Sequence, residues 1–462
     1  MANRTTTRKI ALWLTTALFL LCAAMAFPFL FPAAARAAHA AESGADHTGH
    51  GGGWTALSAE GGELTGGNYY LAADVILTAD LSISGTVTLC LNGFVLTGTG
   101  SSTVIDVGTG ADFTLCDCRE GAAGVANEIN GDIYNSGVIT GGTGRRADTT
   151  AGGGIRAGYD SVFTMNGGAV AGNSADLGGG VYVGGDAFIM NGGTIAGNTA
   201  TGDVFNTGGG ACVWDCAFTM NGGSIAGNTA AAEAGGVYMT GDTFTMNGGT
   251  ITENTATSDG GGIYVGTKGA LNLYGGTITK NTVRTNEGRH GGGVYVESNL
   301  WSGVGKISIS GSPVITGNTR TYTPDSATTT ENLYLGYGFT NSGDLPIITL
   351  GTVASGANIG ISAQKTVFST ASDTDYSGYF SSDDTGYHVE YNADKKLELK
   401  SGAAHVHTGG TAYCNKKAVC TTCGKEYGNL DPTNHSAPKP NEWQGDDKEH
   451  WQVYSCCNAI IN

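Results

Sequence analysis

The sequence predicts an all-β protein: a right-handed single-stranded parallel β-helix (a solenoid), followed by a small C-terminal Cys-rich module. Three observations predict this fold. A repeat of about 26 residues runs through the chain, apolar and polar residues alternate inside each repeat, and glycine accounts for 78 of the 462 residues. That glycine content far exceeds the roughly 7% of ordinary proteins. Together these features indicate short strands joined by tight turns.

The repeat contains two motifs. The first, Gly-Gly-Gly-Val-Tyr, recurs with steps of 26, 30, 26, 26 and 31 residues, and its copies begin, with some variation, at Gly152, Gly178, Gly208, Ala234, Gly260 and Gly291. The second, Phe-x-Met-Asn-Gly-Gly-x-Ile, begins at Phe163, Phe188, Phe218, Phe244 and, as a variant, Leu271. One coil of this size cannot bury its apolar face, whereas a stack of coils makes a continuous core.

Stacking the units places like residues on like. The Phe, Met and Ile positions are expected to form inward columns. The asparagines before Gly-Gly are expected at corners, where stacked amides hydrogen-bond along the axis; these are Asn166, Asn191, Asn221 and Asn247. The alternation continues on both sides of the clean repeats, and residues 64–400 would hold about 13 coils at the 26-residue period.

Two upstream cysteines test the register of the first coils. Cys90 and Cys116 lie one 26-residue period apart, so we expect them on adjacent coils about 5 Å apart. Whether they form a disulfide stays open, because parallel side chains in register fit the disulfide torsion poorly. Cys118 is the alternative partner.

The chain divides into six segments on these patterns. They are a signal peptide (1–40), an N-terminal linker (41–63), N-terminal β-helix coils (64–150), regular β-helix repeats (151–320), irregular C-terminal coils or a cap (321–400) and a Cys/His-rich module (405–462).

The N-terminus predicts export. Arg4, Arg8 and Lys9 precede an apolar run, residues 10–31, and Ala38-His39-Ala40 provides a small-x-small cleavage site. The run is long enough to span a bilayer, so an uncleaved anchor is the alternative. We therefore expect a secreted, extracellular or cell-surface protein, in which disulfides can form.

The charge of the chain narrows the range of partners. The formal net charge is −17, which disfavours nucleic acid and anionic membranes. We expect no nucleic-acid partner, and no membrane contact unless the N-terminal segment stays uncleaved. An extracellular glycan or a host or cell-surface protein remains as the expected partner.

The GGGVY and FTMNGGTIxxNTA units resemble those of pectin-lyase-like right-handed β-helix proteins of bacterial surfaces. The resemblance covers about three quarters of the chain and implies the fold. Its implication for function is broad, since this architecture hosts lyases, hydrolases, adhesins and spacers. We expect a structural or adhesive role. A polysaccharide lyase or a glycoside hydrolase acting on acidic polysaccharide is the alternative.

Enzymes on this fold that cleave acidic polysaccharides need carboxylates on neighbouring coils. Asp186 and Asp242 share one column, but Cys216 occupies it in the coil between them. Cations cluster only near Lys268, Lys280, Arg284, Arg289 and His290. We therefore assign no catalytic residue.

A column of tyrosines is the expected binding surface. We expect these side chains to point outward as a strip that could bind sugar rings or a protein; they are Tyr182, Tyr238, Tyr264 and Tyr295. Cys212 interrupts the strip. The structural alternative is that tyrosine simply favours strands.

The last segment contains a Cys-x2-Cys-Gly motif typical of zinc knuckles. Its candidate metal ligands are Cys414, Cys420, Cys423 and Cys456. Zinc is the only cofactor that the sequence suggests, and disulfides among the same cysteines are the alternative.

Overall fold

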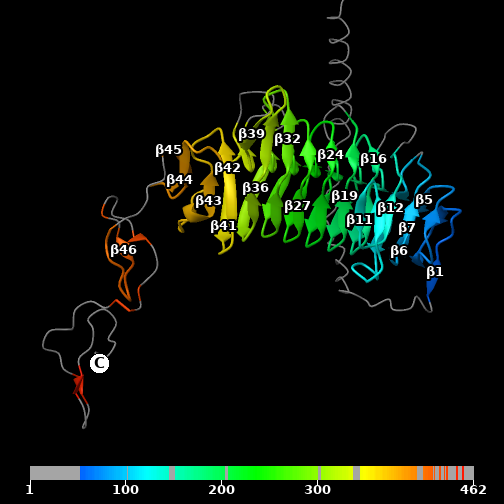
Figure 1. Ribbon diagram of the computed structural model, residues 1–462, viewed down its shortest axis with the longest axis horizontal. Helices are drawn as coiled ribbons and strands as arrows, with labels where there is room; N and C mark the ends of the chain where they lie inside the picture. The colour runs from blue at the N-terminus through cyan, green and yellow to red at the C-terminus, as the bar shows by residue number, and fades with distance from the viewer. Residues whose placement is uncertain are drawn as a thin grey trace, which may run out of the picture. The chain divides into compact units, whose positions relative to one another are not determined.

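Each coil contains short strands at fixed positions. The computed structural model describes residues 53–100, 102–144, 151–202, 207–299, 303–336, 344–402 and 409–419, with a few short pieces between 421 and 451. The predicted signal peptide lies outside the described residues. Within them the strands stack in parallel ladders (Figure 1), and the fold is an all-β parallel β-helix.

The first ladder, here the phenylalanine ladder, has 11 strands and contains the Phe-x-Met motifs. Its members are β1 (Trp54–Ala56), β3 (Gly67–Tyr70), β6 (Thr86–Cys90), β9 (Asp112–Cys116), β14 (Val162–Met165), β18 (Ala187–Met190), β22 (Ala217–Met220), β26 (Thr243–Met246), β30 (Ala270–Leu273), β36 (Lys306–Gly311) and β41 (Ile348–Val353).

The second ladder, the tyrosine ladder, contains the Val-Tyr-Val motifs. Its members are β2 (Gly62–Leu64), β5 (Leu81–Ile83), β8 (Ile105–Val107), β13 (Ile155–Ala157), β17 (Val181–Val183), β21 (Ala211–Trp214), β25 (Val237–Thr240), β29 (Ile263–Val265), β33 (Val294–Val296), β40 (Leu333–Leu335) and β42 (Asn358–Ala363).

The third ladder, the isoleucine ladder, follows Gly-Gly in the regular repeats. Its members are β4 (Val75–Ile76), β7 (Val95–Thr97), β12 (Val138–Thr140), β15 (Ala169–Ala171), β19 (Thr194–Ala196), β23 (Ser224–Ala226), β27 (Thr250–Thr252), β31 (Thr277–Thr279), β37 (Val314–Thr316) and β43 (Phe380–Ser382). Strand β42 pairs with β37, β40 and β43, and so joins the second and third ladders into one 21-stranded sheet.

A fourth, shorter threonine ladder completes the regular coils. Its members are β16 (Ser174–Ala175), β20 (Thr199–Ala200), β24 (Thr229–Ala230), β28 (Thr255–Ala256), β32 (Thr282–Thr285), β38 (Thr319–Tyr322) and β39 (Ala327–Thr330). The remaining elements are the pairs β10 (Asn127–Ile129) with β11 (Asp132–Tyr134), β34 (Ser298–Asn299) with β35 (Gly303–Val304), β44 (Tyr387–Tyr391) with β45 (Leu397–Ser401), β46 (Ala418–Val419) with β47 (Glu426–Tyr427) and β48 (Gln444–Gly445) with β49 (His450–Trp451), and the 3-10 turn η1 (Ser377–Tyr379).

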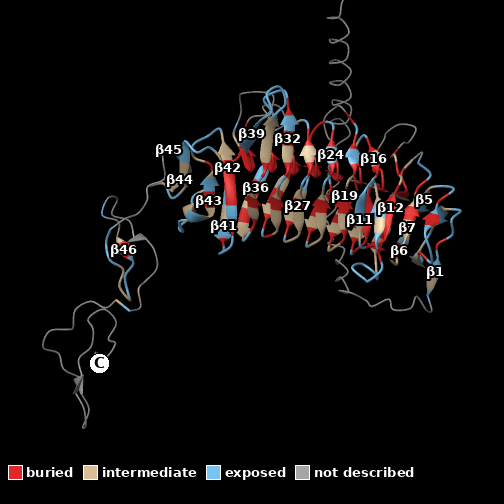
Figure 2. Cartoon of the chain, viewed as in Figure 1, coloured by how far each residue is buried: buried red, intermediate tan, exposed pale blue. Residues whose placement is uncertain are grey.

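The core follows the predicted columns. Phe163 pairs in register with Phe188, and Phe188 with Phe218, and their stacked rings have centroids 5.0 and 4.4 Å apart. Met220 is fully buried and pairs with Met246 on the next strand. Figure 2 shows buried residues running along the stacked strands, with exposed residues mostly in the connecting turns. The register predicted from the repeats is therefore confirmed.

The coil count and the first boundary differ from the prediction. The phenylalanine ladder has 11 strands rather than about 13, because several coils are longer than 26 residues. The longest addition lies between Phe113 and Phe163, which are register neighbours although their positions in the chain are far apart. The ladder also begins at Trp54, inside the segment predicted as a linker.

The register predicted for the N-terminal coils is confirmed. Cys90 at the end of β6 pairs directly with Cys116 at the end of β9. The β-helix therefore begins before the clean repeats, as the two cysteines predicted.

A file of buried asparagines runs through the interior. Its members are Asn173, Asn198, Asn228, Asn254, Asn281, Asn318 and Asn332. At Asn228 both the backbone N–H and Nδ2 donate to Oδ1 of Asn254, at 3.0 and 2.9 Å. The same Nδ2 donates a second bond to the Ile195 carbonyl at 2.9 Å. Each carboxamide in the middle of the file therefore has both its donors and its acceptor satisfied.

At its two ends the buried file hydrogen-bonds to groups other than asparagine side chains: a backbone N–H at one end and a carboxylate at the other. At its first end, the backbone N–H of Gly142 donates to Asn173 Oδ1 at 3.0 Å. At its other end, Asn332 donates from its backbone N and from Nδ2 to the Asp383 carboxylate, at 2.7 and 2.6 Å. A carboxylate accepts without donating, so Asp383 suits the end where only donors remain. Burial raises the pKa of Asp383.

The asparagines before Gly-Gly form a second, exposed file, as predicted. Nδ2 of Asn191 donates to Asn166 Oδ1, Asn221 to Asn191, and Asn247 to Asn221, each at 2.8 Å. Water can replace these bonds, whereas it cannot reach the buried file.

The two files permit a matched test. Replacing Asn228 by Ala removes an acceptor from two donors of Asn198 and should lower the free energy of unfolding by about 3 kcal/mol. The control Asn221→Ala, in the exposed file of the same coil, should cost less than about 1 kcal/mol. Urea denaturation at pH 7 measures both. Equal losses would contradict the role assigned to the buried file.

Candidate functional site

Three of the four predicted tyrosines form a continuous stack on the tyrosine ladder. Tyr238 pairs with Tyr264 and Tyr264 with Tyr295, with ring centroids 5.3 and 5.2 Å apart. Tyr182 pairs with Cys212, which separates it from Tyr238 as the sequence predicted. The stack continues to Tyr334, 5.8 Å beyond Tyr295, a member that the sequence analysis did not include.

The tyrosine stack is not the exposed strip that we expected. Tyr238, Tyr264 and Tyr295 are only 5%, 6% and 1% exposed, and Tyr182 is half-buried. Ala234 belongs to the same apolar cluster, and Leu177 packs against it. Burial raises the pKa of each of these four tyrosines. A binding role for the four tyrosines stays a prediction, but three of them cannot offer a ring face to a sugar in this conformation.

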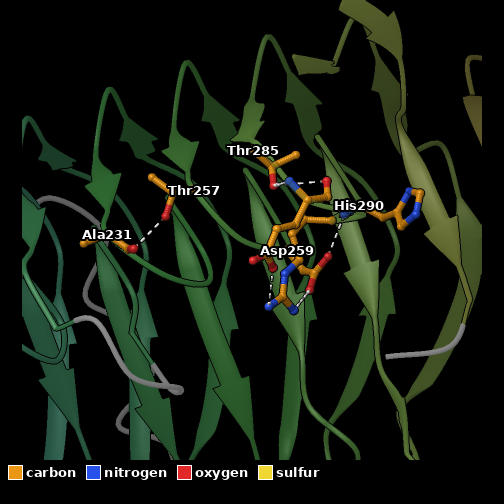
Figure 3. Close-up of polar contacts among 7 residues, drawn as sticks. Ala231, Thr257, Asp259, Thr285 and His290 are labelled. Carbon is orange, nitrogen blue, oxygen red and sulfur yellow. Dashed lines mark hydrogen bonds and ion pairs between the residues drawn. The ribbon is translucent and has the colours of Figure 1, made fainter. Parts of the chain in front are cut away.

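A polar cluster adjoins the stack near Tyr334. Asp259 accepts a hydrogen bond from the His290 backbone N–H at 2.6 Å (Figure 3) and contacts Arg289 at 3.4 Å. His290 Nδ1 lies 2.8 Å from Glu331 Oε1, and the His290 ring stacks on Tyr334 with centroids 4.0 Å apart.

This polar cluster is built chiefly from loop residues that follow the threonine ladder. Thr285 ends β32 and exchanges hydrogen bonds with the Glu287 backbone, and Thr257 donates to the Ala231 carbonyl at 2.6 Å (Figure 3). Arg289 contacts both Asp259 and Glu287. Because the two buried carboxylates, Asp259 and Glu331, accept from backbone N–H groups, the cluster fixes these loops in place.

The second candidate site is a groove beside an insertion. Residues 117–137 leave the phenylalanine ladder after β9 and return before β12, and they contain the hairpin β10–β11. Asp117 begins the insertion and holds its last residue, since it accepts from the backbone N–H of Gly137 at 2.6 Å. It also accepts from the N–H of Gly93 on the preceding coil at 2.7 Å.

Small residues on the isoleucine ladder make room for this hairpin. Ile129 and Tyr134 pack on Ala169 and Ala171. At Gly172 a Cβ atom would lie 2.6 Å from Ile129 Cγ2, so only glycine permits this approach. The hairpin turn is Asn130-Gly131 with both φ angles positive, 54° and 94°, which is the preferred sequence for a two-residue turn.

The groove has a volume of about 520 Å³. Its lining combines carboxylates, hydroxyls, amide groups and small residues: Glu120, Gly121, Asp132, Ile133, Tyr134, Asn135, Ser136, Thr194, Ala196, Gly197, Ala226, Gly227 and Glu253. A Cβ placed on Gly197 would lie 3.5 Å from the Tyr134 hydroxyl and 3.9 Å from Asp132 Oδ2. Both polar groups therefore approach the floor of the groove.

Two pKa values in the groove are shifted. Glu120 is exposed as a residue, but burial of its carboxylate raises the pKa, against the opposing effect of the Gly168 N–H that donates to Oε2 at 3.2 Å. Burial also raises the pKa of Tyr134, helped by the charge of Asp132. The groove thus holds a carboxyl group that retains its proton to higher pH than an ordinary glutamate.

One end of the groove has an unusual backbone. Glu253 and Lys280 have φ angles of 58° and 55°, at a turn position where Gly197 and Gly227 stand in preceding coils. A non-glycine residue in this region costs about 1–2 kcal/mol. Their side chains are well exposed and form an ion pair of 3.1 Å, so a charged pair marks this edge of the groove.

In the structure, as in the sequence, a cysteine interrupts the column that contains Asp186 and Asp242. Asp186 and Asp242 are exposed, and the buried Cys216 lies between them by register. These two acids are not brought together. The groove was missed because one of its walls is the hairpin β10–β11, which lies outside the repeat. The Asn130-Gly131 dipeptide, in the longest interval between Phe-x-Met motifs, was the signal that could have found it.

The predicted zinc ligands are mostly outside the described residues. Cys414 is half-buried, whereas Cys420, Cys423 and Cys456 fall in undescribed positions. No group of three or more His, Cys, Asp or Glu side chains within the described ranges could hold a metal ion. Zinc in the C-terminal module stays a prediction.

Comparisons with protein-family models, with curated proteins and with solved structures gave no match. In the part of the chain that the structure describes, no helix is both long and apolar enough to cross a membrane.

The polar cluster predicts a pH dependence of stability. Burial raises the pKa of Asp259 from 3.8 to about 6, against the opposing effects of the His290 N–H and Arg289. The folded state therefore binds this proton more tightly than the unfolded state. Its contribution is fully present below about pH 4 and is lost as the pH rises to about 6.

The test compares urea denaturation at pH 4 and pH 7. Replacing Asp259 by Asn should reduce the stability difference between the two pH values by up to about 3 kcal/mol. Replacing the exposed Asp242 by Asn is the control and should leave the difference nearly unchanged. An unaltered difference in the Asp259 variant would show that this carboxyl does not titrate as described.

Proposed function

We propose that this chain is an extracellular, pectin-lyase-like β-solenoid that binds a glycan in the groove between the hairpin β10–β11 and the isoleucine ladder, in a structural or adhesive role. The groove is the observation that carries the proposal. Its volume of about 520 Å³ lies within the range of about 300–1,000 Å³ that is usual for small-ligand sites. Export is supported by the signal-peptide pattern of residues 1–40.

The chemistry of the lining favours a sugar. Sugars present many hydroxyl groups, and the Asp132 carboxylate, the Tyr134 hydroxyl and the Asn135 side chain can hydrogen-bond to them. The Tyr134 ring adds apolar surface of the kind that packs against a pyranose. Because the hairpin packs on the ladder before any ligand arrives, little binding energy is needed to order the site.

The charge of the lining favours a neutral or amino sugar. Glu120, Asp132 and Glu253 are its charged residues, and the lining contains no Lys or Arg. A uronate would meet like charge, which costs affinity. This groove therefore suits a neutral glycan better than the acidic polysaccharide considered in the sequence analysis.

A glycoside hydrolase is the second candidate, and one observation favours it. Glu120 has a raised pKa and shares the groove with Asp132. A protonated carboxylic acid and a second carboxylate are the two groups that glycoside hydrolysis requires. A lyase is less favoured, because it needs a cationic base that the lining does not provide.

Binding can be tested with one variant and a matched control. Gly227 has a φ of 62°, and a Cβ there would meet nothing within 4 Å, so Asn, which tolerates this conformation, would project into open groove. We expect Gly227→Asn to weaken binding of neutral oligosaccharides at least tenfold, measured by calorimetry on a panel of glucan, xylan, mannan and chitin fragments.

The control is Gly317→Asn. Gly317 occupies the corresponding turn with a φ of 67°, but it does not line the groove. Its affinity should match that of the unmodified protein. Equal weakening in both variants, or no binding of any oligosaccharide, would contradict the proposal and leave a spacer role. Release of reducing ends that is lost in Glu120→Gln, with binding retained, would establish the hydrolase instead.

A further inference from the structure

Three cysteines gather where the insertion leaves the β-helix. Cys90 and Cys116 end neighbouring strands in register. Cys118 follows two residues later, and its backbone N–H donates to Cys90 Sγ at 3.4 Å. The three thiols thus lie at the root of residues 117–137, beside Asp117, which begins that insertion and holds its last residue.

Cys90 is the thiol that the other two share. Hydrogen bonding to the Cys116 thiol is the main cause that raises the pKa of Cys90, followed by burial, and the Cys118 thiol contacts Cys90 as well. Cys116 Sγ also donates to the Leu89 carbonyl at 3.6 Å, and Cys118 Sγ donates to Asn92 Oδ1 at 3.4 Å.

The register places Cys90 and Cys116 within the distance that a disulfide requires, and a hydrogen bond places Cys118 next to Cys90. Register partners on parallel strands have Cα atoms about 4.8 Å apart, within the accepted range of about 4.4–6.8 Å. The backbone N–H of Cys118 donates a hydrogen bond to Cys90 Sγ, so the Cα and side chain of Cys118 lie close to that sulfur. By contrast, Cys116 ends an extended strand, and residues two apart in extended chain are nearly 7 Å apart and point the same way.

We propose that Cys90, Cys116 and Cys118 form a thiol–disulfide site in which Cys90 pairs with either Cys116 or Cys118, and the third thiol stays beside the bond. The proposal is independent of any glycan in the groove. With Cys118 as partner, the bond ties the root of the insertion to β6. With Cys116 as partner, it ties β6 to β9 and leaves the insertion without a covalent link to β6, held by the hydrogen bonds of Asp117 and by its packing on Ala169 and Ala171.

The reaction needs an oxidant of the disulfide class, such as oxidised glutathione. Cys118 is exposed, so its thiolate attacks one glutathione sulfur and releases the other glutathione as a thiol. Cys90 then attacks the Cys118 sulfur and releases the second glutathione. In total, two electrons pass from the two cysteine sulfurs to glutathione disulfide. The two protons that the cysteines lose protonate the two glutathione thiols that are released.

The third thiol allows the bond to move. Cys116 lies against Cys90, so its thiolate can attack the Cys90 sulfur and displace Cys118 without any external reagent. Burial is the main cause that raises the pKa of Cys118, to about 12, so its thiolate is scarce at neutral pH. Oxidation and exchange should both accelerate as the pH rises from 7 to 9.

Peptide mapping of the full chain tests the proposal. The chain is oxidised with glutathione disulfide at pH 8.5, blocked with an alkylating reagent, cleaved without reduction and analysed by mass spectrometry. We expect Cys90–Cys118 and Cys90–Cys116 links in the unmodified chain. In Cys116→Ser only the Cys90–Cys118 link should remain. In Cys118→Ser only the Cys90–Cys116 link should remain.

The variant Cys90→Ala decides whether Cys90 is the shared partner. It should abolish every link within the three, while Cys116 and Cys118 are recovered as alkylated thiols. A Cys116–Cys118 link in this variant, or the absence of any Cys90 link in the unmodified chain, would overturn the proposal.

Thermal unfolding gives a second readout: oxidised Cys116→Ser should melt about 3 to 6 °C higher than its reduced form. An unchanged melting temperature would contradict the tie to the insertion.

Discussion

The buried file of asparagines is the constraint on which the other features of the β-helix depend. From Asn173 to Asn332, successive coils each bring one carboxamide into an interior that water does not reach. Such a group is tolerated only when its hydrogen bonds are made. Asn198 can donate to Asn228 Oδ1 at 3.0 Å only if neighbouring coils are stacked in one register. The hydrophobic columns tolerate small shifts, whereas the carboxamides do not, so the file selects a single stacking from several that would bury similar apolar area.

A fixed register explains how the chain can carry long additions without losing its fold. The insertion at residues 117–137 leaves and re-enters at defined positions because Phe113 and Phe163 still pair directly. The insertion then packs on Ala169 and Ala171 and creates a groove that the regular coils lack. The candidate binding site therefore lies where the repeat is interrupted, and the regular coils provide the rigid support on which it is built.

The sequence predicted the features that the period controls. The Phe and Met columns, the stacked asparagines and the alignment of Cys90 with Cys116 all follow from spacing. The burial of Tyr264 did not, because alternation shows which face of the strand a side chain is on but not which residues from other segments pack against it. The polar cluster around Asp259 and the groove at Asp132 join residues from different coils and loops. No local pattern gives the separation of such residues in space.

Hydrogen exchange of the asparagine side chains tests the central claim most directly. In uniformly 15N-labelled protein, the Nδ2 protons of Asn198, Asn228 and Asn254 should exchange with solvent deuterium on the timescale of global unfolding. Those of the exposed file, such as Asn191 and Asn221, should exchange orders of magnitude faster, because water reaches them without unfolding. Rapid exchange of both files would contradict the account, since it would show that the buried carboxamides do not fix the register of the coils.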